Sequence, residues 1–136
     1  MKANQNIEEI NEDGKILAIV IRNAFNKPGC SFVTPDDFPF QLGVHISEAE
    51  TRIRAHRHVP FKELRNVYPQ EFFYVESGKI EVGIYNNMDK HSKIILGKGD
   101  MVVLNCAHEV TFLKDSKFVE LKQGPYRGKD AEKEYF

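Results

Sequence analysis

Short apolar runs separated by turn residues occupy most of this chain, and they constrain its fold more than any other feature. The run Lys15–Ile21 is rich in β-branched residues and follows a turn at residues 12–14. Closely spaced runs of this kind, with Gly, Asn or Asp between them, are typical of strands in a sandwich or barrel. No run reaches the roughly 20 apolar residues that a membrane-spanning helix needs. We therefore predict an all-β protein.

Nine segments have the composition of strands. They are 15–21, 40–46, 51–58, 71–76, 79–85, 92–96, 101–104, 109–113 and 117–122. Only residues 6–11 and the polar tail 129–136 have helical potential, and neither has the apolar periodicity that buries a helix face. The length of 136 residues fits one domain. We place a barrel over about 40–122, an N-terminal strand extension over 1–39 and a polar tail over 123–136.

Charge and cysteine content limit the partners and the compartment. The net charge of -1 gives no electrostatic reason to expect nucleic acid or an anionic membrane as a partner. The N-terminus lacks the apolar core of a secretory signal. We therefore expect a cytoplasmic protein in which Cys30 and Cys106 are thiols.

A His-x-His pair is the first candidate for metal chemistry. His56 and His58 lie two apart in the predicted strand 51–58, so both imidazoles would point to one face. Two neutral imidazoles form half of a site for Zn, Mn, Fe, Ni or Cu. On its own, such a pair is more often solvated or part of a core.

Glu71 is the second candidate, because alternation places it on the same strand face as Phe73 and Val75. A carboxylate beside large apolar side chains is costly unless it is paired or bound to a cation. The alternative is that Glu71 lies in water at a strand end. His108, which follows the apolar run 101–104, is the third candidate.

The order of these residues resembles the two motifs of the cupin superfamily. His56-x-His58 is followed by Glu71 with Gly78 seven positions later, then by the Gly99-Asp100 turn and His108. This resemblance covers about residues 40–122. It implies a jelly-roll barrel, or double-stranded β-helix. It also implies one divalent transition metal (Zn, Mn, Fe or Ni), held by His56, His58, Glu71 and His108.

Two features depart from the cupin pattern. Twelve residues separate His58 from Glu71, where cupins commonly have three or four. Glu63, within this insertion, is a rival ligand, but only Glu71 has a strand and a glycine at the matching offset. In the second motif, residues 105–107 replace the usual Pro and Gly before the histidine. The insertion also offers Lys62 and Arg65 as contacts for an anionic substrate, although a solvated loop is the more common role of such charges.

The resemblance also implies a range of functions. Residues 34–38, 41–43 and 120–126 are similar to small bacterial cupins without a settled activity, many of them linked to carbohydrate metabolism. We expect metal-assisted isomerisation, lyase or oxygenase chemistry on a small-molecule ligand such as a sugar derivative or keto acid. The alternatives are a non-catalytic sensing cupin and a metal-free sugar epimerase, with His56 as base and Tyr74 as acid. Cupins usually pair through edge strands, which implies a homodimer.

Overall fold

The structure is a computed structural model that describes residues 5–54, 56, 58, 68–123, 127–128, 131 and 133–136. The chain divides into two compact units. We call Met1–Phe25 with Pro69–Phe136 the sandwich unit, and Asn26–Tyr68 the hairpin unit. No helix in the described part of the chain is long and apolar enough to span a bilayer.

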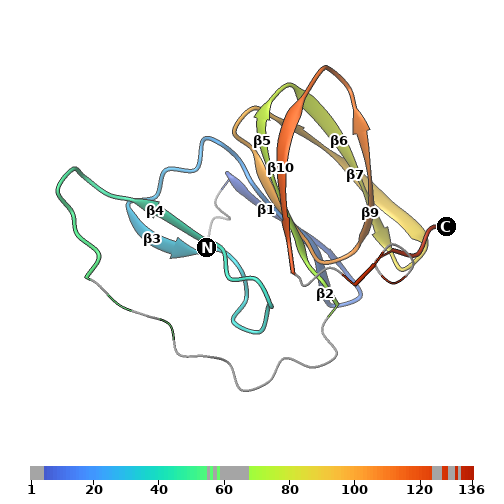
Figure 1. The fold of residues 1–136 in the computed structure, drawn as a ribbon, viewed down its shortest axis with the longest axis horizontal. Helices are drawn as coiled ribbons and strands as arrows, with labels where there is room; N and C mark the ends of the chain where they lie inside the picture. The colour runs from blue at the N-terminus through green and yellow to red at the C-terminus, as the bar shows by residue number, and fades with distance from the viewer. Residues whose placement is uncertain are drawn as a thin grey trace. The chain divides into compact units, whose positions relative to one another are not determined.

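The sandwich unit contains two antiparallel sheets (Figure 1). The five-stranded sheet has the order β1 (Ile7–Glu12), β2 (Lys15–Ile21), β8 (Met101–Leu104), β5 (Glu71–Ser77) and β10 (Lys117–Lys122). The three-stranded sheet has the order β7 (Asp89–Gly97), β6 (Lys79–Asn86) and β9 (Ala107–Phe112). The hairpin unit contains the antiparallel pair β3 (Gly29–Phe32) and β4 (Gly43–Ile46).

One hydrophobic core lies between the two sheets of the sandwich unit. The five-stranded sheet contributes buried side chains such as Phe73 and Leu104, and the three-stranded sheet contributes Ile80, Ile84 and Leu96. Burial of this many apolar side chains is the main stabilising term of the unit. The all-β prediction is confirmed. No closed barrel is found among the described strands, so the jelly-roll barrel stays a prediction.

The predicted strands at 15–21, 101–104 and 117–122 coincide with β2, β8 and β10. Two expectations from the sequence are wrong. The segment 6–11, which was one of two segments with helical potential, forms most of strand β1, because it pairs with β2. The predicted strand 51–58 is not formed by its described residues 51–54, 56 and 58. Its one large apolar side chain, Ile53, is 66% exposed, so the segment has no apolar face to bury.

Gly78 occupies the tight turn between β5 and β6, and its conformation explains why a glycine stands there. Its φ is 88°, which side chains of L residues rarely adopt. A Cβ atom at this position would also collide with Ser116 and the backbone of Asp115. The turn therefore needs glycine for conformation and for space.

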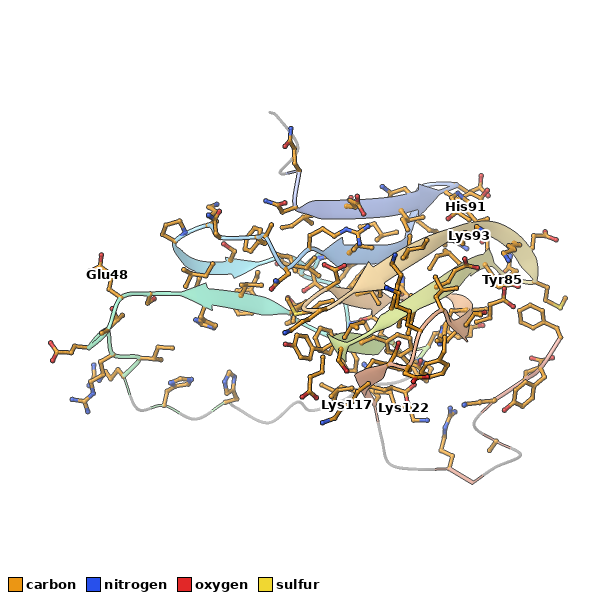
Figure 2. All side chains as sticks on the ribbon, turned by 90° about the horizontal axis from the view of Figure 1, so that it is seen from above. Glu48, Tyr85, His91, Lys93, Lys117 and Lys122 are labelled. Atoms are coloured by element: carbon orange, nitrogen blue, oxygen red, sulfur yellow. The ribbon has the colours of Figure 1, made fainter. Side chains whose placement is uncertain are left out.

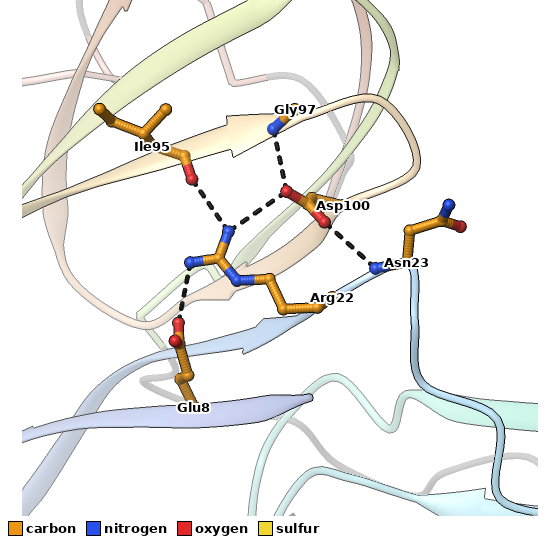
Figure 3. A network of polar contacts seen from close by, with 6 residues as sticks. All are labelled: Glu8, Arg22, Asn23, Ile95, Gly97 and Asp100. Carbon is orange, nitrogen blue, oxygen red and sulfur yellow. Dashed lines mark hydrogen bonds and ion pairs between the residues drawn. The ribbon is translucent and has the colours of Figure 1, made fainter. Parts of the chain in front are cut away.

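A polar network ties the turn before β8 to β1, to β7 and to the residues that follow β2 (Figure 3). Arg22 donates from Nη1 to the carbonyl of Ile95 at 2.9 Å and to Asp100 Oδ2 at 3.2 Å. Its Nη2 donates to Glu8 at 2.9 Å. The Asp100 carboxylate also accepts the backbone N–H groups of Gly97 and Asn23. Asp100 is therefore the acceptor on which three donors converge.

Replacing Asp100 by alanine should lower the free energy of unfolding by about 2–3 kcal/mol, because it leaves a partly buried guanidinium and two N–H groups without this acceptor. Replacing the more exposed Glu8 by alanine should cost about 0–1 kcal/mol, as for surface ion pairs. Denaturant unfolding of the two variants measures both effects. Equal losses in the two variants would contradict this assignment.

Candidate metal centre

Glu71 and His108 meet in the interior of the sandwich unit, although 36 residues separate them in the chain. Glu71 is the first residue of β5, and His108 is the second residue of β9 in the other sheet. The His108 Nε2 atom lies 2.8 Å from Glu71 Oε2. Their side chains are only 22% and 15% exposed, so this contact is largely screened from solvent.

The strand registers explain why these two side chains face each other. Glu71 is opposite Leu104 of β8, and His108 is opposite Ile84 of β6. Both of these partners are core residues, and residues directly opposite on paired strands share a face. The ring of Phe73, two residues after Glu71, meets the His108 ring edge to face at 5.7 Å between centroids.

The backbone fixes the hydrogen-bonding state of the His108 ring. His108 Nδ1 lies 3.0 Å from the carbonyl oxygen of Cys106, which only accepts, so Nδ1 carries a hydrogen. In the neutral ring, Nε2 then has a free lone pair, which faces the carboxylate oxygen of Glu71. Glu71 Oε2 is buried, and at 2.8 Å it lies at hydrogen-bond distance from this nitrogen. Two facing lone pairs at this separation need a proton between them.

In the metal-free protein the pair favours the doubly charged state. Burial opposes charge on His108, but contact with Glu71 and with the Cys106 carbonyl outweighs it, so the pKa of His108 is raised. Burial likewise opposes charge on Glu71, yet the adjacent His108 lowers the pKa of that carboxyl. In this state Nε2 carries a proton, which it donates to Glu71 Oε2.

The contribution of this pair to the stability of the metal-free protein should be greatest in weak acid. His108 has a raised pKa, so its contribution is complete below its ordinary value of 6.5 and is lost as the pH rises through the folded pKa. Glu71 has a lowered pKa, so its contribution is complete above 4.5 and is lost as the pH falls through the folded pKa. The difference in unfolding free energy between wild type and Glu71→Gln should therefore peak between these two values. A difference that does not vary with pH would contradict the ion pair.

Glu120 is a neighbour of this pair that the sequence reasoning missed. It is opposite Phe73 in the β10–β5 register and therefore lies on the same face as Glu71. Burial, followed by the negative charge of Glu71, raises the pKa of Glu120. Lys122, labelled in Figure 2, is directly opposite Glu71 in the β10–β5 register, and its charge favours the ionised form of the Glu71 carboxyl. The sequence does place residues 118, 120 and 122 on one face of a strand. Only the pairing of β10 with β5 shows that this face is the one that carries Glu71.

Amide side chains around the fully buried Gln70 hold the start of β5, and with it Glu71. The backbone N–H of the fully buried Gln70 donates to Gln123 Oε1 at 2.7 Å. Gln70 Nε2 donates to Asn105 Oδ1 at 3.1 Å, and Asn105 Nδ2 donates to the Ile16 carbonyl at 3.1 Å. These hydrogen bonds tie residue 70, directly before β5, to Gln123, Asn105 and the Ile16 carbonyl, and so hold the start of the strand.

His56 and His58 lie together in the hairpin unit. Their ring centroids are 5.3 Å apart, and His56 Nδ1 lies 2.8 Å from the Arg54 carbonyl. Among the described residues, no group of three or more His, Cys, Asp or Glu side chains is arranged to hold a metal ion. The structure therefore brings the four predicted ligands together as two pairs, one in each unit. That the pairs form one site stays a prediction.

The remaining candidate residues from the sequence lie outside the described residues or away from the Glu71–His108 pair. Glu63, Lys62 and Arg65 lie outside the described residues. Tyr74, proposed as an acid, alternates with Glu71 and Phe73 on β5, so it lies on the opposite face of the strand. His45 is exposed.

Comparisons with known proteins do not identify the chain. No family model matches it, and neither a curated protein nor a solved structure does. The cupin resemblance is therefore untested, and the case for a site rests on the geometry of Glu71 and His108.

Proposed function

We propose that this protein binds one divalent transition metal ion, with Glu71 and His108 as two of its ligands. One observation carries the proposal. A buried carboxylate oxygen lies 2.8 Å from the one ring nitrogen of His108 that the Cys106 carbonyl leaves free. A backbone carbonyl that orients a histidine through its other nitrogen is the usual support of a metal ligand.

The donor atoms fit such an ion in kind. Imidazole nitrogen and carboxylate oxygen bind Zn, Mn, Fe and Ni, at about 2.0–2.2 Å in the case of Zn. Two donors at tetrahedral positions then lie roughly 3.4 Å apart. The observed 2.8 Å is a hydrogen-bond distance, so the two side chains would move apart to admit the ion. His56 and His58 are the predicted remaining ligands.

A bound ion would act as a Lewis acid on an oxygen of a small polar molecule, such as a sugar derivative or keto acid. The residues of the chain hold and shield this centre. The Phe73 ring covers one edge of His108, and the buried row around Gln70 fixes the strand that presents Glu71. Isomerisation, lyase and oxygenase reactions all suit this arrangement, and a screen of such substrates would choose among them.

Metal titration of the chelator-treated full chain tests the proposal. We expect calorimetry with Zn²⁺, Mn²⁺ and Ni²⁺ to show one ion per chain for at least one metal. The melting temperature should rise with the concentration of that metal, because a ligand that binds only the folded state stabilises it. His91→Asn, a change of an exposed histidine in β7, is the control that should bind equally well. Absence of stoichiometric binding for all three metals would refute the proposal.

The close contact of Glu71 with His108 also favours a second candidate, a metal-free acid–base pair. A carboxylate that stabilises an imidazolium is the arrangement of a general acid or base. This candidate predicts that turnover of a sugar-like substrate survives a strong chelator, whereas the metal proposal predicts its loss.

A further inference from the structure

A thiol and an imidazole face each other across the strands of the hairpin unit. Cys30 of β3 is directly opposite His45 of β4. Cys30 Sγ lies 3.6 Å from His45 Nε2, and both residues are exposed. On the same face, the neighbouring cross-strand pair is Phe32 with Gly43, which has no titratable group. His45 is therefore the one proton acceptor in register beside this thiol in the described hairpin.

The second cysteine of the chain lies in the opposite kind of environment. Cys106 packs against the core of the sandwich unit, where its side chain is partly buried. Limited access therefore protects Cys106 from small disulfides, whereas Cys30 is exposed. The reaction rate of Cys106 can therefore serve as a reference for that of Cys30 in the same chain.

We propose that Cys30 is a modification site that forms mixed disulfides with low-molecular-weight disulfides such as oxidised glutathione, with His45 as the proton acceptor. In this step, His45 Nε2 takes the proton of the Cys30 thiol. The thiolate then attacks one sulfur of the small disulfide, a new S–S bond forms, and the original S–S bond breaks. The bonding electrons leave with the other sulfur as a thiolate, which takes up a proton from the imidazolium or water. The small disulfide is the only oxidant that the step needs.

Exposure and geometry both support this assignment. An exposed cysteine contributes little to packing, so its side chain has no evident structural role on the hairpin. A nucleophile beside a base at contact distance is the arrangement that activates a cysteine. The proposal does not depend on a metal, so its failure and the failure of the metal proposal are separate results.

Reaction of the full chain with oxidised glutathione at neutral pH, followed by intact mass and peptide mapping, tests the proposal. We expect one adduct per chain, on Cys30, and none on Cys30→Ser. His45→Asn should react at least about tenfold more slowly, since it keeps a polar side chain but removes the base. His91→Asn, which changes a histidine in the other unit, should react like wild type.

A parallel reaction in denaturant shows whether a change in reaction rate depends on the folded contact between Cys30 and His45. There, wild type and His45→Asn should react at the same rate, because the strands no longer align the pair. Circular dichroism verifies that each variant is folded under native conditions. Modification of Cys106 at a comparable rate, or an unchanged native rate for His45→Asn, would overturn the proposal.

Discussion

Replacing His108 by alanine should abolish stoichiometric metal binding, and replacing Glu71 by glutamine should weaken it by about 100-fold or more. Loss of a residue that only supports a ligand already costs about 10–100-fold, and loss of a ligand itself should cost at least as much. Calorimetry and the metal-dependent rise in melting temperature measure both effects. His108→Asn, which retains a polar side chain, guards against a folding defect in the alanine variant.

Two further variants make this result specific. Glu109→Gln is the matched control, because Glu109 follows His108 in β9 but pairs with Lys90 at the surface at 3.0 Å. It should bind metal like wild type. The double variant His56→Ala/His58→Ala tests the remaining predicted ligands. If it binds as wild type does, the four-ligand set is wrong. If Glu71→Gln binds as wild type does, the metal centre itself is wrong.

Replacing Phe73 by alanine should lower the free energy of unfolding by about 3–5 kcal/mol, as for other buried phenylalanines. The side chain is 2% exposed, and its ring contacts those of Phe118 at 4.9 Å and His108 at 5.7 Å between centroids. Removing it would leave a cavity between the two sheets. Denaturant unfolding gives the loss directly.

Phe112→Ala is the control for this prediction. Phe112 also contacts Phe118, at 5.8 Å between ring centroids, but it is 58% exposed. Its replacement should therefore cost about 1 kcal/mol or less. A similar loss for both variants would show that the interior around Phe73 is not the main core of the unit.

The sequence predicted those strands whose apolar pattern is local and strong. β2 is a continuous apolar run, and β8 is a short one bounded by turn residues, so both could be placed at their true limits. β1 carries only Ile7 and Ile10 as large apolar residues, and its strand form depends on pairing with β2. Such pairing is a tertiary effect that local propensity does not contain.

The candidate site was predictable to a similar extent. Strand alternation placed Glu71 with Phe73 and Val75, and the structure retains that face. The contact between His108 and the Cys106 carbonyl depends on the backbone path before β9, which no residue pattern specifies. Glu120 was missed for a related reason: β10 had to be aligned with β5 before its charge could be placed beside Glu71.

The carbonyl of Cys106 would couple the proposed metal uptake to the pH of the solution. It keeps a hydrogen on Nδ1, so a protonated ring could become a ligand only by giving up the hydrogen on its other nitrogen. Capture of an ion by the protonated ring would therefore release acid into the buffer, and the proposed centre would compete for ions more effectively in alkaline than in acidic surroundings.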